Sequence, residues 1–225
     1  MSNVLPQSYG FHIPEVYQIE LTNNCNLRCR MCGRQYMKRK VGYMDLDLLE
    51  LMLKRGDFTN SYFVELHFAG EPLLHPKFKE AAEMLKAYGI LVGASTNGTL
   101  LKHRIKDVLP LDLLTVSLDT LNPKVYEKWR CGGKLENVVE GLHKLLQIPP
   151  CERPIVEIQT IDMPQYRGAF EAIKREFGMY KGVVIKRVPD CFLVVRGEVD
   201  AKYVLNDLCL NPWLSVSVYW DGTVV

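Results

Sequence analysis

The sequence has no long apolar run. No stretch of about 20 apolar residues occurs among its 225 residues, and residues 1–10 lack the basic start and apolar core of a secretory signal. These absences argue against a membrane-spanning helix and against secretion, so we expect a cytoplasmic protein whose thiols stay reduced. Hydrophobic residues make up 48% of the chain, enough for one substantial core at this length.

A strong charge of one sign is missing as well. The net charge is +2, with 24% of residues charged, and no basic module with interleaved aromatic residues is present. Binding to DNA or RNA is therefore not expected. Basic residues gather between residues 28 and 40 and could attract an anionic substrate. We favour the simpler interpretation that these charges balance a negative cluster or face solvent.

Cysteine is sparse outside one short segment. Four of the seven cysteines stand singly, which argues against a disulfide framework. The other three lie within eight residues: Cys25, Cys29 and Cys32. Thiolates are the preferred ligands of iron-sulfur clusters, which normally take four cysteines, so three on one loop leave an iron open to a substrate or cofactor. The alternative is a structural zinc site, which needs a fourth Cys or His.

Short β-rich segments alternate with amphipathic helical segments along the chain. The expected strands are Val16–Leu21, Tyr62–Phe68, Ile90–Thr96, Leu113–Leu118, Ile155–Ile161 and Val183–Val188. The expected helices are Leu46–Arg55, Pro76–Tyr88, Leu135–Leu146 and Tyr166–Phe177. Six such repeats in a row predict the parallel sheet of an α/β protein, either doubly wound or curled into a full or partial barrel.

Polar residues stand where the first four expected strands end. The cysteine segment follows the first strand and Gly70-Glu71-Pro72 follows the second, while Ser95 to Gly98 close the third and Ser117 to Asp119 the fourth. Each is ordinary alone, since such residues also begin helices and Asp119 could cap the next one. In parallel α/β folds, however, reactive groups gather at the carboxyl ends of strands. Four consecutive strand ends therefore indicate one site.

These residues resemble the radical S-adenosylmethionine (SAM) superfamily, whose signature is CxxxCxxC after the first strand of a partial (β/α)6 barrel. The resemblance covers most of the chain and implies a partial (β/α)6 TIM-like barrel. It also implies that Cys25, Cys29 and Cys32 hold a 4Fe-4S cluster. The amino and carboxylate groups of SAM would chelate the fourth iron.

The resemblance assigns further residues to SAM. Gly70, Glu71 and Pro72 match a GGEP-like motif that receives the methionyl amine, with Ala69 replacing its first glycine. The positions matched to the ribose and carboxylate of SAM are Ser95, Asn97 and Ser117, and Arg130 resembles an arginine that pairs with the carboxylate. Met31 stands where relatives often carry an aromatic residue that shields the adenine, a surface that a thioether can also cover.

Three residues are candidates for contact deeper in the barrel. Asp119 matches a position near the substrate in relatives, and Gln159 and Lys186 are expected to point into the barrel from the fifth and sixth strands. We expect Asp119 and Lys186 to be catalytic and Gln159 to bind the cofactor. The resemblance implies that an electron from a donor such as flavodoxin or ferredoxin cleaves SAM to methionine and a 5'-deoxyadenosyl radical, which abstracts a substrate hydrogen.

The carboxyl-terminal residues indicate a subgroup. Cys209 to Trp213 and then Val216 to Gly222 resemble the opening of a SPASM or twitch extension, in which further cysteines bind auxiliary clusters. The next cysteine would be expected about five residues after Gly222, beyond Val225. We therefore expect residues 1–195 to form the barrel and residues 196–225 to begin a truncated β-hairpin extension. An auxiliary iron-sulfur cluster is expected only if the chain continues.

The substrate is not determined by the resemblance. Relatives with this kind of tail mostly modify peptides or proteins, or act on sugars and nucleosides. We expect modification of a peptide or protein or of a biosynthetic small molecule, with a sugar or nucleoside dehydrogenase, epimerase or decarboxylase as the alternative in the same superfamily. A non-catalytic iron-sulfur or zinc-binding protein is an alternative of another class, but it would give the polar strand ends no shared role.

Overall fold

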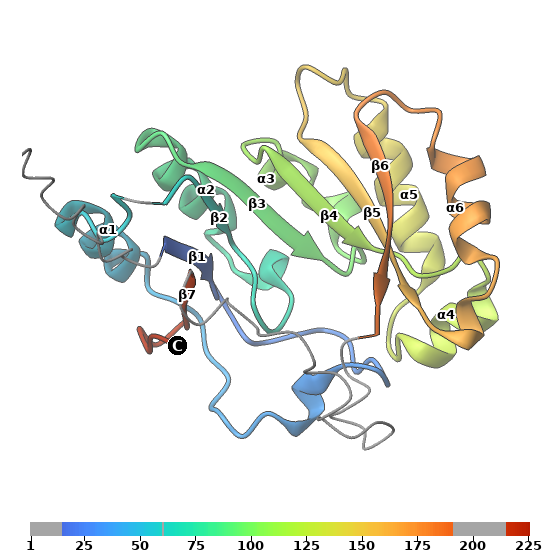
Figure 1. Cartoon of the computed structure of the whole chain (residues 1–225), viewed down its shortest axis with the longest axis horizontal. Coiled ribbons are helices and arrows are strands. Elements are labelled where there is room, and N and C mark those ends of the chain that lie inside the picture. The colour runs from blue at the N-terminus through green and yellow to red at the C-terminus, as the bar shows by residue number, and fades with distance from the viewer. Residues whose placement is uncertain (1–14, 60, 191–214) are drawn as a thin grey trace, which may run out of the picture.

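Seven parallel strands form one sheet in the computed structural model, which describes residues 15–59, 61–190 and 215–225. They are β1 (Glu15–Ile19), β2 (Phe63–Glu65), β3 (Leu91–Thr96), β4 (Leu113–Ser117), β5 (Ile155–Asp162), β6 (Val183–Pro189) and β7 (Ser215–Val218). Their order across the sheet is β6-β5-β4-β3-β2-β1-β7 (Figure 1). From β1 to β6 the spatial order follows the chain order, as a succession of βα units produces.

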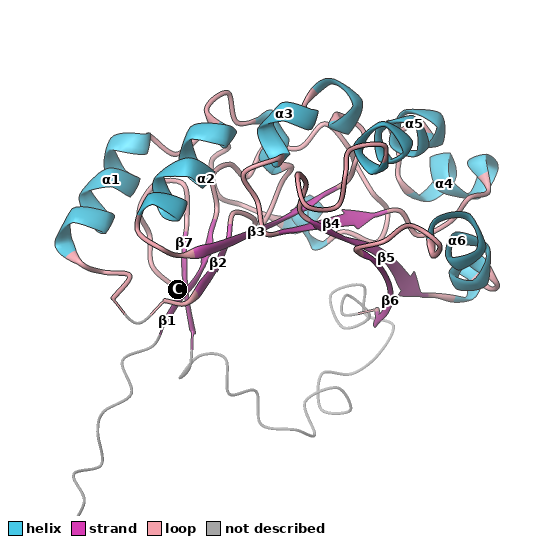
Figure 2. Ribbon diagram, turned by 90° about the horizontal axis from the view of Figure 1, so that it is seen from above, coloured by secondary structure: helices cyan, strands magenta, loops and turns pink. Residues whose placement is uncertain are grey.

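The described helices cover one face of this sheet. They are α1 (Leu46–Arg55), α2 (Phe78–Ala87), α3 (Ile105–Val108), α4 (Pro123–Trp129), α5 (Leu135–Leu146) and α6 (Ala169–Phe177). Figure 2 shows a curled sheet with these helices along its outer face. The strands themselves form the inner layer of the curl. The predicted α/β fold, a parallel sheet curled as in a partial barrel, is therefore confirmed. None of the described helices is long and apolar enough to cross a membrane.

The core lies between the helices and the outer face of the sheet. Alternate strand residues are fully buried there: Val64, Val92, Leu114, Val116, Val156 and Ile158. They pack against buried helix residues, which include Leu49, Leu85, Leu142 and Ile173. Because successive strand residues point to opposite faces, the residues between the buried ones face the inside of the curl.

Two of the four predicted helices have the boundaries that the sequence indicates, and two begin later. Helix α1 has its predicted ends, with the Asp45 carboxylate accepting from Asp47 N and Gly56 closing the helix at φ 78°. Helix α5 also has its predicted ends. Helix α2 begins at Phe78, two residues later than expected. Helix α6 begins only at Ala169, because a 3-10 turn and Gly168 at φ 76° precede it.

The carboxyl-terminal residues form the expected hairpin. Ser217 and Val225 exchange two backbone hydrogen bonds of 2.8 and 2.9 Å, and the turn passes through Gly222 at φ 85°. The first arm of this hairpin is β7, which pairs in parallel with β1 and extends the sheet at that edge. Cys191 and Cys209 lie outside the described residues, and the proposed boundary near residue 195 stays a prediction.

Candidate cluster and cofactor site

The cysteine loop, residues 20–44, lies at the carboxyl end of the sheet. Figure 1 shows this loop at the end toward which the arrowheads of β3 to β6 point. Its two arms are tied together by side chains near the start of the loop. The Thr22 hydroxyl donates to Gly42 O at 2.6 Å, and Asn23 Nδ2 donates to Lys40 O at 2.8 Å. The three cysteines are therefore carried on a closed and supported loop.

The three thiols are partly buried, and backbone N–H groups point at two of them. Leu27 N donates to Cys25 Sγ, and Arg34 N donates to Cys32 Sγ, each at 3.4 Å. Such bonds stabilise a sulfur that carries negative charge. Burial raises the pKa of Cys25, and it raises the pKa of Cys29 to about 11 although Arg130 opposes the shift. Bound iron would supply the charge that keeps these thiols deprotonated.

This donor set fits an iron-sulfur cluster in chemistry. Three thiols on one supported loop, two of them approached by backbone N–H groups, are the kind of ligand that such clusters take. In residues 15–59, 61–190 and 215–225, no three His, Cys, Asp or Glu side chains are grouped so as to hold one metal ion. The three predicted ligands lie on one loop, and their binding of an iron-sulfur cluster stays a prediction.

Gly70 packs directly against the cysteine loop. Its φ is 94°, and a Cβ atom at this position would lie 2.5 Å from Asn24 O. The next residue, Glu71, donates its backbone N–H to the same Asn24 oxygen at 2.7 Å. Only glycine allows both the left-handed backbone and this close approach. The segment after β2 is thus held against the loop that carries Cys25.

The Glu71 carboxylate is buried and is held by donors from within the protein. It is 1% exposed and accepts hydrogen bonds from Thr96 Oγ1 at 2.7 Å, Asn97 N at 2.7 Å and Leu73 N at 3.1 Å. Burial nevertheless raises the pKa of Glu71. In this arrangement the carboxylate joins the end of β2 to the end of β3, and the three donors occupy most of its accepting capacity.

Asn97 connects the end of β3 to the cysteine loop. Its Nδ2 donates to Asn26 Oδ1 at 2.9 Å and lies 3.9 Å from Cys25 Sγ. Its Oδ1 accepts from Thr99 N at 2.9 Å. The expected site residues Glu71 and Asn97 are therefore brought together with Cys25, as the strand-end pattern predicted.

Asp119 and Arg130 form a buried ion pair. Both Nε and Nη2 of Arg130 lie 2.7 Å from Asp119 Oδ2, and the residues are 1% and 6% exposed. Asp119 Oδ1 accepts from Ile161 N at 3.1 Å, and the residue has a left-handed φ of 63°. Although burial alone would lower it, the pKa of Arg130 is raised by the charge of Asp119. Asp119 does not cap α4, because Asn122 does so.

The remaining predicted residues lie in register on the inner face. Ser117, Gln159 and Lys186 are partners across β4, β5 and β6, and Ser95 lies one row away, opposite Thr115. Lys186 Nζ is 3.3 Å from a Glu157 carboxylate oxygen. Ser117 and Gln159 face the inside of the curl because their neighbours in each strand are buried. Lys186 shares that face because it is the cross-strand partner of Gln159.

Three further inner-face residues were not predicted: Glu65, His67 and Glu157. Burial raises the pKa of Glu65 and lowers the pKa of His67 to about 4, and His67 Nδ1 has no hydrogen-bond partner in the described part of the chain. The sequence did contain a signal for these three residues. Polar residues at every second position of a strand with apolar neighbours indicate a polar inner face, and these three follow that spacing.

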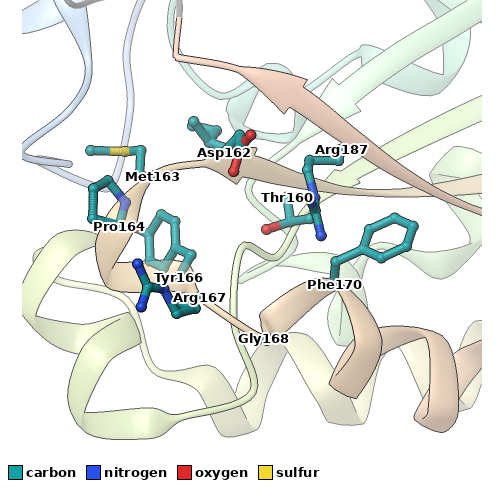
Figure 3. A pocket seen from close by; sticks show the side chains of 10 residues that line it. Thr160, Asp162, Met163, Pro164, Tyr166, Arg167, Gly168, Phe170 and Arg187 are labelled. Carbon is teal, nitrogen blue, oxygen red and sulfur yellow. The ribbon is translucent and has the colours of Figure 1, made fainter.

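A cavity of about 400 Å³ opens beside β5 and α6. Its lining includes Thr160, Asp162, Arg167 and Arg187, and Figure 3 shows these side chains around Tyr166 and Phe170. The Arg187 guanidinium lies 4.8 Å from the Phe170 ring centre. Thr160 connects this cavity to the ion pair, because its hydroxyl donates to Asp119 O at 2.9 Å.

Comparison with known families decides the identity. The sequence family described as the radical SAM superfamily matches residues 19–151, more than half of the chain. The chain belongs to the radical SAM superfamily. The matched segment begins in β1 and contains the cysteine loop, the Gly70–Pro72 segment and the Asp119–Arg130 pair, so this radical SAM protein carries the predicted strand-end residues in the matched region.

The relatives that match this radical SAM chain in sequence include proteins of two kinds. A tungsten-containing aldehyde ferredoxin oxidoreductase cofactor-modifying protein from Pyrococcus furiosus is 37% identical over 216 residues, covering 92% of this chain and 55% of its own length. A probable GTP 3',8-cyclase from Methanococcus maripaludis is 32% identical over 145 residues, covering 62% of this chain and 48% of its own length. The chain thus spans about half the length of these curated relatives.

Solved structures share the fold of this radical SAM protein. Streptococcus suis SuiB bound to S-adenosylmethionine superposes with a TM-score of 0.64 at 12% identity, covering 95% of this chain and 60% of that one. The [FeFe]-hydrogenase maturase HydG superposes with a TM-score of 0.52 at 11% identity, covering 77% and 43%. At these identities the likeness concerns the fold.

Proposed function

We propose that Cys25, Cys29 and Cys32 hold a 4Fe-4S cluster and that SAM binds its fourth iron. The observation that carries this proposal is the closed loop with three thiols, which is fastened to the ends of β2 and β3 through Gly70 and Asn97. Membership of the radical SAM superfamily supports it. When bound, the cluster and SAM supply one-electron cleavage that yields a 5'-deoxyadenosyl radical able to abstract a substrate hydrogen.

The residues around the loop orient these groups. Because the Glu71 carboxylate is occupied by three internal donors, we assign it to hold the backbone of Gly70 to Pro72, whose carbonyl groups suit the ammonium group of SAM. Ser95, Asn97 and Ser117 stay assigned to the ribose and carboxylate. Leu27 and Met31, 2% and 3% exposed, help to exclude water beside the cysteines.

The substrate in this proposal is a biosynthetic small molecule rather than a peptide. The relative that matches 92% of this chain is named for modifying the cofactor of a tungsten enzyme, which supports a cofactor or its precursor as substrate. Polar groups suited to hold such a molecule line the inner face: Glu65, Glu157, Gln159 and Lys186. Asp119 and Lys186 stay candidates for catalysis, and a small iron-sulfur or flavin protein such as ferredoxin or flavodoxin is the proposed electron donor.

A second candidate is cyclisation of a purine nucleotide. It is favoured by the sequence match to proteins named GTP 3',8-cyclase, which runs over 62% of this chain. Supplying GTP or the cofactor of a tungsten-dependent aldehyde oxidoreductase to the reduced protein with SAM distinguishes the two candidates. The substrate is the compound whose disappearance matches 5'-deoxyadenosine formation, and neither candidate stands if both compounds persist while a peptide is consumed.

The test of the catalytic assignment is 5'-deoxyadenosine release from SAM by the anaerobically reconstituted, reduced protein. We expect release by the parent and loss of both iron and release in Cys29→Ala. Cys151→Ala is the matched control, because Cys151 is exposed and lies away from the loop. Full iron content without release in the parent would refute the assignment for this chain, and equal release by Cys29→Ala would refute the ligand set.

A further inference from the structure

Cys29 lies opposite Arg130. Arg28 N donates to Cys131 O at 2.9 Å, and Arg30 N donates to Trp129 O at 2.8 Å. These two bonds join positions on either side of Cys29 to positions on either side of Arg130. In an antiparallel arrangement, the two residues between such bonds face each other and their side chains come close. The guanidinium is therefore a neighbour of the middle cysteine.

The surroundings of Cys29 are apolar. A small cluster of buried side chains lies there: Met31, Met163, Tyr166 and Ala169. Cys29, Trp129 and Ile161 pack against this cluster. Met31, expected to shield the adenine, is 3% exposed and belongs to this packing. In such a medium a nearby charge acts more strongly than it does in water.

The Arg130 charge is also fixed in position. A hydrogen bond from Nε and an ion-pair contact from Nη2, each 2.7 Å long, hold its guanidinium on Asp119. Asp119 is itself held by Ile161 N and by the hydroxyl of Thr160. With 6% of its surface exposed, Arg130 stays out of solvent. A buried guanidinium that is tied to its own carboxylate is poorly placed to serve as a free partner for the carboxylate of SAM.

We propose that Arg130, held in place by Asp119, sets the reduction potential of the cluster through its charge beside Cys29. This inference rests on the proposed cluster at Cys25, Cys29 and Cys32. One-electron reduction adds a negative charge to the cluster, so a fixed positive charge nearby favours the reduced state and raises the potential. The negative charge of Asp119 partly offsets this rise in reduction potential. Arg130 acts as a positioning and electrostatic residue rather than as a ligand of SAM.

The test is a redox titration of the reconstituted protein, followed by electron paramagnetic resonance of the reduced cluster. We expect Arg130→Met to lower the ratio of reduced to oxidised cluster at a fixed potential about tenfold, which for one electron corresponds to about 59 mV. Asp119→Asn should shift the ratio in the opposite direction. Asn also tolerates the left-handed backbone at position 119, so this variant keeps the local chain path. Arg130→Lys, which keeps the charge, should shift the ratio less than Arg130→Met.

Arg153→Met is the matched control. Arg153 is also a buried arginine, but it binds backbone carbonyls at the amino-terminal side of β5, and its loss should leave the potential at the parent value. Shifts in the same direction for Arg130→Met and Asp119→Asn, or equal shifts for Arg130→Met and Arg130→Lys, would overturn the inference. A parent protein that forms no cluster would instead refute the proposed function, so the two failures are distinguishable.

Discussion

At the scale of single residues, Gly70 makes a close contact between the segment after β2 and the cysteine loop. Gly70→Ala would place a Cβ atom 2.5 Å from Asn24 O at a φ of 94°. The left-handed backbone costs about 1–2 kcal/mol and the overlap about 1–3 kcal/mol more. We therefore expect the free energy of unfolding to fall by about 2–5 kcal/mol in urea denaturation, with loss of cluster loading.

Gly89→Ala separates these two costs. Gly89 has a similar φ of 76°, but a Cβ atom there would meet nothing within 4 Å. Only the backbone cost of about 1–2 kcal/mol should appear, and cluster loading should be unchanged. Equal losses for the two variants would show that the close approach of Gly70 to Asn24 has no energetic effect.

His67 predicts a pH dependence of stability. Burial lowers the pKa of His67 to about 4, below its ordinary value of 6.5. As the pH falls from 6.5 toward 4, the unfolded chain takes up a proton that the folded chain does not. This histidine should therefore remove about 3 kcal/mol of stability over that range, and the loss should level off below pH 4.

The variant His67→Asn checks this expectation. The difference in free energy of unfolding between variant and parent, measured in denaturant at a series of pH values, should change in favour of the variant below pH 6.5. Curves that run parallel from pH 7 to pH 4 would show that His67 takes up protons equally in both states.

At the scale of elements, α5 packs unusually close to the turn at Leu101–His103. A Cβ atom on Gly141 would lie 2.9 Å from Lys102 N and 3.0 Å from Leu101 Cβ. Alanine in place of glycine inside a helix ordinarily stabilises by about 1 kcal/mol. Here we expect Gly141→Ala to lower the free energy of unfolding by about 1–3 kcal/mol, because α5 or the turn must shift.

A surface position on the same helix is the control for that prediction. Glu136 is exposed in the first turn of α5, and Glu136→Ala should change the free energy of unfolding by less than about 0.5 kcal/mol. Helix propensity alone predicts that Gly141→Ala stabilises the protein. If it did, α5 would not pack against Leu101 as closely as these distances indicate.

The helices and strands that could be predicted are those with a periodic pattern of apolar residues in the local sequence. Helices α1 and α5 follow from their periodic apolar faces, and all six predicted strands are present near their expected positions. The short helices α3 and α4 were missed, because four and seven residues offer little periodicity. The Asp119–Arg130 pair was missed for a different reason. It depends on a left-handed residue after β4 and on the path of the chain after α4, and the sequence specifies neither locally.

At the scale of the whole molecule, the site is assembled from segments far apart in the chain. The cysteine loop, the end of β2 and the end of β3 are joined through Gly70, Glu71 and Asn97. The parallel order of the strands made this assembly predictable, since it places the carboxyl ends of consecutive strands side by side. What the inner face binds was not predictable, because side chains of four strands combine there only in the folded chain.

This assembly predicts that cluster loading stabilises the whole barrel. A group that binds only the folded state adds its binding free energy to stability. Reconstitution should therefore raise the melting temperature of the parent by several degrees, at about 2–4 °C per kcal/mol for a chain of this size. Cys32→Ala should show a smaller rise, and a parent whose melting temperature is the same with and without iron and sulfide would contradict the expectation.

The central claim is that three cysteines leave one iron of the cluster open to SAM. Its most direct test is the electron paramagnetic resonance spectrum of the reconstituted, reduced protein, recorded before and after SAM is added. We predict about four irons per chain, with a signal that changes shape on addition of SAM because SAM binds the iron that Cys25, Cys29 and Cys32 leave free. A fully loaded cluster whose spectrum is identical with and without SAM would contradict the account.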